Sequence, residues 1–262
     1  MDTHTLAAQP QDVPVSVRWL NPIGCPTFDA PIADLLHGIK QPSTQIEVVS
    51  FDMPHSPTHL EYRAYEALTY ERTLRIARDC GQQHIDALVI GCFYDPALED
   101  AREISGDTIV VAPCQASLQV VEHLANRFSI IVGRTKWMEQ MHDRVRRYGA
   151  ADRLASMRPL GMGVDEFQKD PAVTRRRIIE QAMLAVEEDG AEAIVLGCTI
   201  EFGFFEQVQR EVGVPVIALA GMKRRFGWSP SRVGSCEPPP EAEMKAFGLF
   251  QGPVPIGNRV KA

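Results

Sequence analysis

The sequence predicts an α/β protein with two similar domains, each built on a small parallel sheet flanked by helices. Short β-branched runs alternate with longer stretches of helical periodicity, which is the pattern of βαβ units. One strand and the loop after it occur twice in the chain, which indicates an internal repeat. The connections between the runs are short, as parallel βαβ units require.

Two sets of apolar, β-branched runs are expected to form the strands. The first set is Val15–Leu20, Gln45–Phe51, Ala87–Ile90 and Thr108–Ala112. The second set is Phe128–Val132, Leu154–Leu160, Ala193–Leu196 and Val214–Leu219. The main helices are expected at Glu61–Cys80, Ser117–Ala125, Met138–Tyr148, Thr174–Asp189 and Phe204–Glu211. A T-x-x-E capping box at Thr58–Glu61 should start the first of these helices, and Gly190 should stop the fourth.

Composition excludes several classes of protein. The chain has 262 residues, 45% of them hydrophobic and 23% charged, which suffices for one large or two small domains. A net charge of -7 and the lack of a basic stripe argue against nucleic acid or an anionic membrane as partner. No apolar run has the length of a membrane span, and Met1–Val13 lacks a signal-peptide pattern, so we predict a cytoplasmic protein.

The repeated segment ends in a cysteine. Ile85–Cys92 matches Ala191–Cys198 almost position for position. Each cysteine follows a glycine at the carboxyl end of an apolar strand, which is the edge where open α/β folds bind ligands. Two related halves packed face to face would present Cys92 and Cys198 to one cleft. We therefore predict that the active site lies in the cleft between the domains and takes a small molecule.

Two facing thiols suit the inversion of a carbon acid. One thiolate removes a proton from one face while the opposite thiol delivers a proton to the other face. A free thiol has a pKa of about 8.5, and backbone N–H groups or helix N-termini near the sulfur increase the thiolate fraction. Two thiolates in a dry cleft repel, so the pair should hold one proton between them. This chemistry needs neither a metal nor an organic cofactor.

A structural interpretation competes with the catalytic one. A single cysteine at the end of a buried strand is commonly just a small hydrophobic residue. Two cysteines at equivalent positions of a repeat, each after a glycine, favour catalysis instead. The six cysteines include no C-x-x-C pair, so no zinc site is expected, and without a signal peptide the thiols should stay reduced.

The residues around both cysteines resemble the aspartate/glutamate racemase superfamily, and within it the hydantoin/allantoin racemase branch. Gly91–Leu98 is close to that branch's GCF-x-DPGL motif, and Val195–Thr199 is similar to its LGC-[AT] motif. The resemblance implies cofactor-independent racemisation of a 5-substituted hydantoin or an allantoin-like cyclic ureide, with Cys92 and Cys198 as the acid/base pair. It also implies that the C-terminal tail returns to the first domain. The domains would then be residues 1–113 plus 222–262, and residues 114–221.

The substrate is expected to contact the loops after the strands. The backbone N–H groups of Phe93 and Thr199 should hold a substrate carbonyl, and Asn21 either binds substrate through its amide or forms an Asx-turn. The expected substrate-binding residues are Asn21, Phe93, Tyr94, Arg134, Thr199 and Ile200.

Several of these loops depart from the family pattern. Cys25 follows the first strand in a Gly-Cys-Pro segment, Cys114 and Gln115 replace a glycine-rich segment, and Gly133 replaces one of two threonines. The departures leave the two-thiol chemistry intact. Arg134 and Gln115 are expected beside the site, so a substrate more polar or anionic than an alkylhydantoin is an alternative.

Two other functions also stay open. Related superfamily members use cysteine for cis–trans isomerisation by covalent addition, as maleate isomerase does, or for decarboxylation. The decarboxylase pattern keeps one of the two thiols, so the presence of both argues against it. A non-catalytic protein that binds a small ligand is the third alternative. A homo-oligomer is compatible with all of them.

Overall fold

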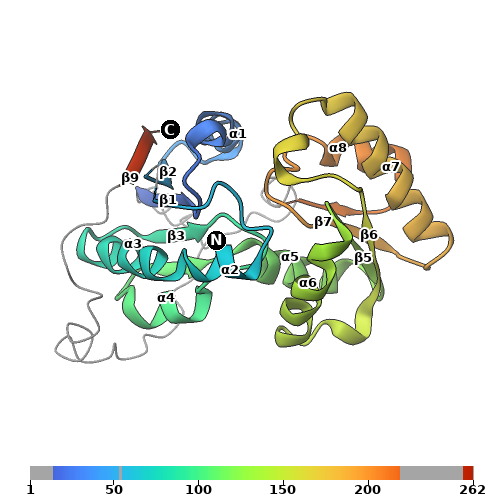
Figure 1. Cartoon of the computed structure of the whole chain (residues 1–262), viewed down its shortest axis with the longest axis horizontal. Coiled ribbons are helices and arrows are strands. Elements are labelled where there is room, and N and C mark those ends of the chain that lie inside the picture. The colour runs from blue at the N-terminus through green and yellow to red at the C-terminus, as the bar shows by residue number, and fades with distance from the viewer. Residues whose placement is uncertain (1–13, 53–54, 219–255, 262) are drawn as a thin grey trace, which may run out of the picture.

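The computed structural model describes residues 14–52 and 55–218 and the backbone of residues 256–261. It contains two sheets, and each carries its own helices, the first group on the left of Figure 1 and the second on the right. This confirms the predicted α/β class with two similar halves. No helix in the described part of the chain is long and apolar enough to cross a membrane.

The first sheet has five strands in the order β4-β3-β1-β2-β9. Strands β1 to β4 pair in parallel, and β9 pairs antiparallel with β2 at the edge. The sequence did not indicate this last strand. The bounds are β1 (Val15–Asn21), β2 (Thr44–Phe51), β3 (Ala87–Ile90), β4 (Ile109–Val111) and β9 (Ile256–Lys261).

The second sheet has four parallel strands in the order β6-β5-β7-β8. When β5 to β8 are matched with β1 to β4 in chain order, the neighbours in the two sheets are the same. The repeat therefore covers the whole sheet and not only the cysteine segments. The bounds are β5 (Phe128–Val132), β6 (Leu154–Pro159), β7 (Ala193–Leu196) and β8 (Val216–Ile217).

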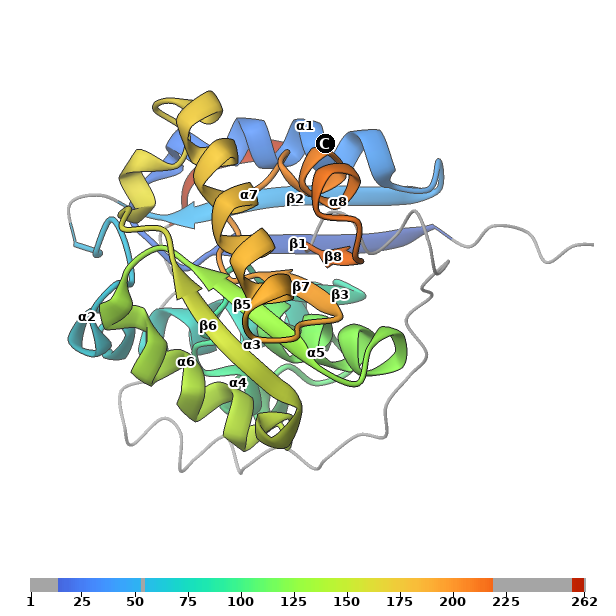
Figure 2. The same cartoon turned by 90° about the vertical axis from the view of Figure 1, so that its right-hand side faces the viewer.

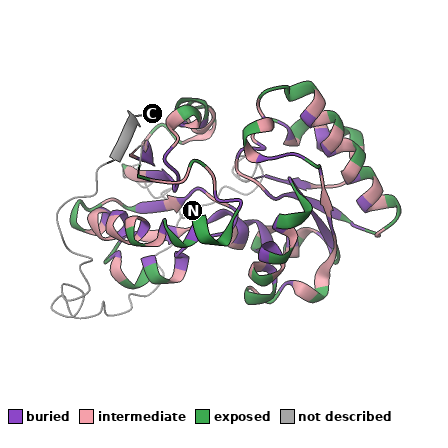
Figure 3. Cartoon of the chain, in the orientation of Figure 1, coloured by how far each residue is buried: buried purple, intermediate pink, exposed green. Residues whose placement is uncertain are grey.

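Helices cover both sheets, and their buried side chains close the cores (Figure 3). Figure 2 shows α7 crossing over the second sheet, where it packs on β5, β6 and β7. The helices are α1 (Asp29–Ile39), α2 (Arg63–Ala67), α3 (Tyr70–Gln82), α4 (Leu98–Ile104), α5 (Pro113–Leu124), α6 (Thr135–Arg147), α7 (Pro171–Glu187) and α8 (Phe205–Val212).

The predicted helix over Glu61–Cys80 is wrong in two respects. It is divided into α2 and α3 at Leu68–Thr69, where the Thr69 hydroxyl donates to the Glu66 carbonyl at 2.7 Å and competes with regular helix bonding. The capping box does not form, because α2 begins at Arg63 without a side-chain cap. The Glu61 carboxylate instead accepts the backbone N–H of Val164, in the second half, at 3.1 Å.

Two other helices differ from the expectation. Helix α1 was not predicted, although Pro31 in its first turn and buried Ile32 and Ala33 are compatible with a helix. Helix α5 begins at Pro113, four residues before the predicted start at Ser117. Proline is favoured at the first position of a helix, and a distant carboxylate, described below, caps this N-terminus.

Candidate active site

Glycine and cysteine follow β3 and β7 in the same way. The N–H of Gly91 donates to the carbonyl of Leu20 at 2.7 Å, and that of Gly197 donates to the carbonyl of Ile131 at 2.8 Å. A Cβ atom would lie 2.9 Å from the Leu20 oxygen at Gly91 and 2.6 Å from the Ile131 oxygen at Gly197. Each glycine therefore allows a central strand to approach closely and fixes the start of the cysteine loop.

The chain then makes the same turn after each cysteine. The N–H of Asp95 donates to the carbonyl of Cys92 at 3.0 Å, and the N–H of Glu201 donates to the carbonyl of Cys198 at 3.1 Å. Each turn thus places a buried acidic residue at the third position after the cysteine. The structure therefore repeats the hydrogen bond that closes the turn and the place of the acid, as well as the sequence.

The two cysteine loops are in contact across the halves. The Thr199 hydroxyl donates to the carbonyl of Gly91 at 3.1 Å. A negative charge on Cys92 contributes to raising the pKa of Cys198, so the sulfurs are electrostatically coupled. The structure therefore brings the two predicted cysteines into one site.

A small cavity lies against Cys198, between the halves. Its volume is about 20 Å³, which is room for about one water molecule. Trp19 and side chains of α1 line it from the first half, and Thr199, Glu201 and Phe202 line it from the second.

Protein surrounds both sulfurs, although each cysteine keeps part of its surface open to solvent. Burial raises the pKa of the Cys92 thiol to about 12 and raises that of Cys198 well above its ordinary value. The backbone N–H of Tyr94 lowers the pKa of Cys92, and the N–H of Ile200 does the same for Cys198. These donors belong to the turns, not to helix N-termini, because α4 and α8 begin further along the chain.

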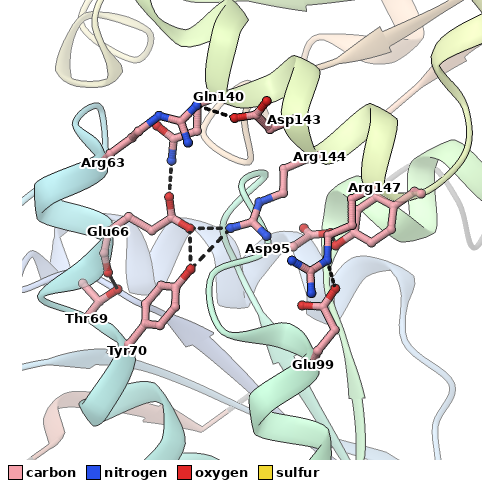
Figure 4. A network of polar contacts seen from close by, with 11 residues as sticks. Arg63, Glu66, Thr69, Tyr70, Asp95, Glu99, Gln140, Asp143, Arg144 and Arg147 are labelled. Atoms are coloured by element: carbon pink, nitrogen blue, oxygen red, sulfur yellow. Dashed lines mark hydrogen bonds and ion pairs between the residues drawn. The ribbon is translucent and has the colours of Figure 1, made fainter.

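Acidic groups and paired arginines surround the thiols. Charges on Glu66 and Asp95 raise the pKa of Cys92, and charges on Glu201 and, to a lesser extent, Glu61 raise that of Cys198. Arg144 binds Glu66 Oε1 at 2.6 Å. Figure 4 shows how Arg144 and Gln140 of α6 meet Glu66 of α2, which ties the two halves together beside the site.

A larger hollow lies next to this network. Its volume is about 540 Å³, and it contains no cysteine. Its lining is Arg63, Tyr70, Gln140, Asp143, Arg144, Arg146 and Arg147. The smaller cavity, which lies against Cys198, is the candidate site, because the cysteine loops carry groups able to move a proton.

Residues 27–222 match the model of a family described as Asp/Glu/Hydantoin racemase. The chain belongs to this family. A hydantoin racemase from Paenarthrobacter aurescens is 31% identical over 86% of this chain and 97% of its own. One from Pseudomonas sp. strain NS671 is 35% identical over 69% of this chain and 72% of its own. The family resemblance of the two cysteine motifs is thereby confirmed, and the protein is an isomerase of the racemase type.

Solved structures agree with the fold. An allantoin racemase from Klebsiella pneumoniae aligns with a TM-score of 0.74 at 24% identity, covering 90% of this chain and 89% of that one. An allantoin racemase from Pseudomonas fluorescens has a TM-score of 0.69 at 25% identity, covering 83% and 94%. The maleate isomerase Iso from Pseudomonas putida S16 shares the fold with a TM-score of 0.60 at 16% identity, covering 90% and 93%.

Other residues expected to bind substrate lie around the pair. Phe93, Tyr94 and Ile200 are buried in the two turns, and the Tyr94 hydroxyl has no hydrogen-bond partner. Burial, and then charges on Cys92 and Cys198, raise the pKa of Tyr94, which keeps its hydroxyl neutral. Tyr94 therefore places a hydrogen-bond donor near both thiols.

Asn21 and Arg134 already have partners. Asn21 donates from Nδ2 to Asp29 Oδ1 at 2.5 Å and accepts from Trp19 Nε1 at 2.8 Å, so no Asx-turn forms. Arg134 is 46% exposed, and its guanidinium nitrogens lie 3.5 Å from Glu61 and 3.6 Å from Glu166.

The departures from the family pattern have structural roles here. The backbone N–H groups of Cys114 and Gln115 each donate to Asp95 at 2.8 Å, which caps the N-terminus of α5. At Gly133, a Cβ atom would lie 2.5 Å from the carbonyl of Met162. Cys25 donates to the Thr27 hydroxyl at 3.3 Å.

Sequence reasoning missed four acidic residues around the thiols: Glu61, Glu66, Asp95 and Glu201. For Asp95 and Glu201 a signal existed, because both stand three residues after a repeated cysteine. For Glu61 and Glu66 no local signal existed, since their partners come from the second half of the chain.

Proposed function

We propose that this protein racemises a 5-substituted hydantoin or an allantoin-like cyclic ureide, with Cys92 and Cys198 as the acid/base pair and without a cofactor. The observation that carries the proposal is the contact between two equivalent cysteine loops through Thr199 and Gly91. An inversion needs a base and an acid on opposite faces of one carbon, and two copies of one loop that meet across a cleft supply them.

The proposed reaction has two proton transfers. The thiolate of one cysteine takes the proton from the ring carbon beside a carbonyl, which leaves an enolate. The thiol of the other cysteine then gives its proton to the opposite face of that carbon. The product leaves the two cysteines with exchanged protonation states, and the reverse reaction restores them.

The turns supply donors for the enolate oxygen. Within the described part of the chain, the backbone N–H groups of Phe93 and Thr199 donate no hydrogen bond, so both are available to a substrate carbonyl. The unpartnered hydroxyl of Tyr94 is a third donor beside the thiols. Ile200 occupies the position equivalent to Tyr94 and offers an apolar surface there.

A neutral ring fits the charges better than a dicarboxylate. Arg144 is paired with Glu66, and Arg134 lies between Glu61 and Glu166. Since both guanidinium groups already face carboxylates, neither is left to bind a substrate carboxylate. Relatives 31% and 35% identical are named hydantoin racemases, which supports a ring of that class.

Substrate entry requires the site to widen. A cavity of about 20 Å³ is too small for a cyclic ureide. We therefore propose that the residues that line this cavity from the two halves move apart to admit the ring. We also propose residues 1–113 with 222–262 as one domain and 114–221 as the other, a division supported by the pairing of β9 with β2.

The test is proton exchange in D2O with single enantiomers of allantoin and several 5-substituted hydantoins, followed by NMR and circular dichroism. We expect exchange together with loss of the optical signal. Aspartate and maleate serve as anionic comparison compounds. Inversion of aspartate alone would contradict the ureide assignment, and a thioether adduct with maleate, seen by mass spectrometry, would favour covalent cis–trans isomerisation. Tight binding of a ureide without any exchange would favour the non-catalytic alternative.

A further inference from the structure

Glu201 lies in the Cys198 turn, and the proposed proton transfers give it no role. Its side chain is 1% exposed. Oε2 accepts the backbone N–H of Cys198 at 3.2 Å, while Oε1 is buried without a hydrogen-bond partner. A buried carboxylate with a bare oxygen is costly, so this geometry favours the neutral carboxylic acid.

The surroundings of Glu201 offer no compensating positive charge among the described residues. Burial raises its pKa well above the ordinary value, and only the Cys198 N–H acts in the other direction. The titratable groups that face Cys198 from other elements are Cys92 and Glu61, and neither is a cation. The remaining residues around this cavity are uncharged: Trp19, Ile32, Leu35, Leu36, Thr199, Phe202, Gly203, Phe205 and Ala218.

Asp95, the equivalent acid of the first turn, is bonded differently. Its Oδ1 accepts the N–H of Cys114, and its Oδ2 accepts the N–H of Gln115 and the hydroxyl of Tyr148 at 2.9 Å. Both oxygens are therefore used, and neither accepts the N–H of Cys92, which donates to the carbonyl of Ile90. Only the acid of the second turn is bonded to its own cysteine.

We infer that Glu201 is a positioning residue that sets the reactivity of Cys198 and not that of Cys92. As a neutral acid, Glu201 holds the Cys198 turn without opposing a thiolate there. When Glu201 loses its proton to solvent at alkaline pH, its charge opposes the Cys198 thiolate. The inference rests on the proposed role of Cys198. It predicts that alkaline pH limits the reaction rate in the direction in which Cys198 is the base.

Alkylation of the intact protein by iodoacetamide tests this without substrate turnover. The rate at each cysteine is followed by peptide mass spectrometry from about pH 6.5 to 10 in the wild type and in Glu201→Gln. The glutamine amide reproduces the neutral acid, because its oxygen can accept the Cys198 N–H. We expect equal rates at the acid end. At the alkaline end, Cys198 should react about tenfold faster in the variant, since a neighbouring like charge raises a thiol pKa by about one unit or more.

Cys92 in the same digest is the internal control and should react at the wild-type rate. Asp95→Asn is the reciprocal variant, because the charge on Asp95 raises the pKa of Cys92; it should leave Cys198 unchanged. If Glu201→Gln does not fold, Glu201→Met, which is uncharged and of similar length, decides the question.

Two results would overturn the inference: unchanged alkylation of Cys198 at every pH, or equal acceleration of both cysteines, which would show general loosening. The proposed function is tested separately, because full inversion by Cys198→Ser would refute it whatever the alkylation rates are. A Cys198→Ser variant that loses inversion, together with unchanged alkylation in Glu201→Gln, would refute the role of Glu201 alone.

Discussion

In the loop after β3, Asp95 caps helix α5, whereas in the loop after β7, Glu201 bonds to the backbone N–H of its own cysteine, Cys198. Both loops are closed by a hydrogen bond from the N–H of the acid to the carbonyl of the cysteine, although Asp95 has a positive φ of 48° and Glu201 does not. The difference lies in what surrounds each acid. A repeated backbone can therefore supply two thiols at equivalent positions while their environments differ, so the two directions of an inversion need not have the same pH dependence.

Removal of either thiol should have the largest effect on the rate of inversion. Cys92→Ser and Cys198→Ser should each lower the rate of inversion by about 10³-fold, because a positioned acid or base contributes 10²–10⁴-fold. Each variant should keep solvent-proton exchange with one enantiomer only, and the two variants should differ in which one. Chiral analysis and NMR in D2O measure both effects. Cys25→Ser, at a partly exposed thiol outside the pair, is the matched control, and full inversion by either active-site variant would disprove the two-base mechanism.

The next largest effect on kcat is expected at the side chain two residues after the cysteine, and only in the first loop. Tyr94→Phe should lower kcat by about 10²-fold, since it removes a hydrogen-bond donor aimed at developing charge. Ile200→Val, at the equivalent position, should change kcat little, because it shortens an apolar side chain by one methyl group. Steady-state kinetics on both variants provide the comparison. Equal losses in the two would show that these positions act through packing and not through a hydroxyl.

The two glycines should behave alike, because the close approach of a strand is common to both loops. Gly91→Ala and Gly197→Ala should each lower the free energy of unfolding by about 1–3 kcal/mol, as overpacking does. Gly38→Ala is the control, since a Cβ there meets no atom within 4 Å and it lies in helix α1; alanine should stabilise by about 0.5–1 kcal/mol. Urea unfolding measures all three variants. If alanine left the free energy of unfolding unchanged at only one of the two glycines, the two turns would not be structurally equivalent.

The pH dependence should reflect both thiols. Burial raises the pKa of Cys92 to about 12 and that of Cys198 in the same direction, so both are mainly protonated at neutral pH. Because the reaction needs one thiolate, kcat/KM should rise with pH, by up to about tenfold between pH 7 and 8. Initial rates from each enantiomer, measured in constant ionic strength, test this. A rate that falls over this range would mean that a different group limits the reaction.

The fold class and the cysteine pair could be predicted because they depend on local patterns. The apolar runs predicted strands β1 to β8 but not β9, and the repeated Gly-Cys segments predicted a candidate site at the strand ends. The start of α5 could not be predicted, because its cap is Asp95 from a distant loop. The division of the expected helix into α2 and α3 was also missed, since the break depends on the bond of the Thr69 hydroxyl to the Glu66 carbonyl, which the helical periodicity of the segment does not reveal.

By itself, the sequence determined the parallel strands β1 to β8, the repeat that relates the two halves and the two cysteines, because hydrophobic periodicity and a repeated motif are properties of neighbouring residues. Tertiary structure alone decided that the loops touch through Thr199 and Gly91, that Arg144 faces Glu66, and that Asp95 and Glu201 have different partners. Except for the local bond between Glu201 and the Cys198 N–H, these features join segments far apart in the chain. The charge and burial around each thiol therefore depend on how the two halves pack, which no local pattern encodes.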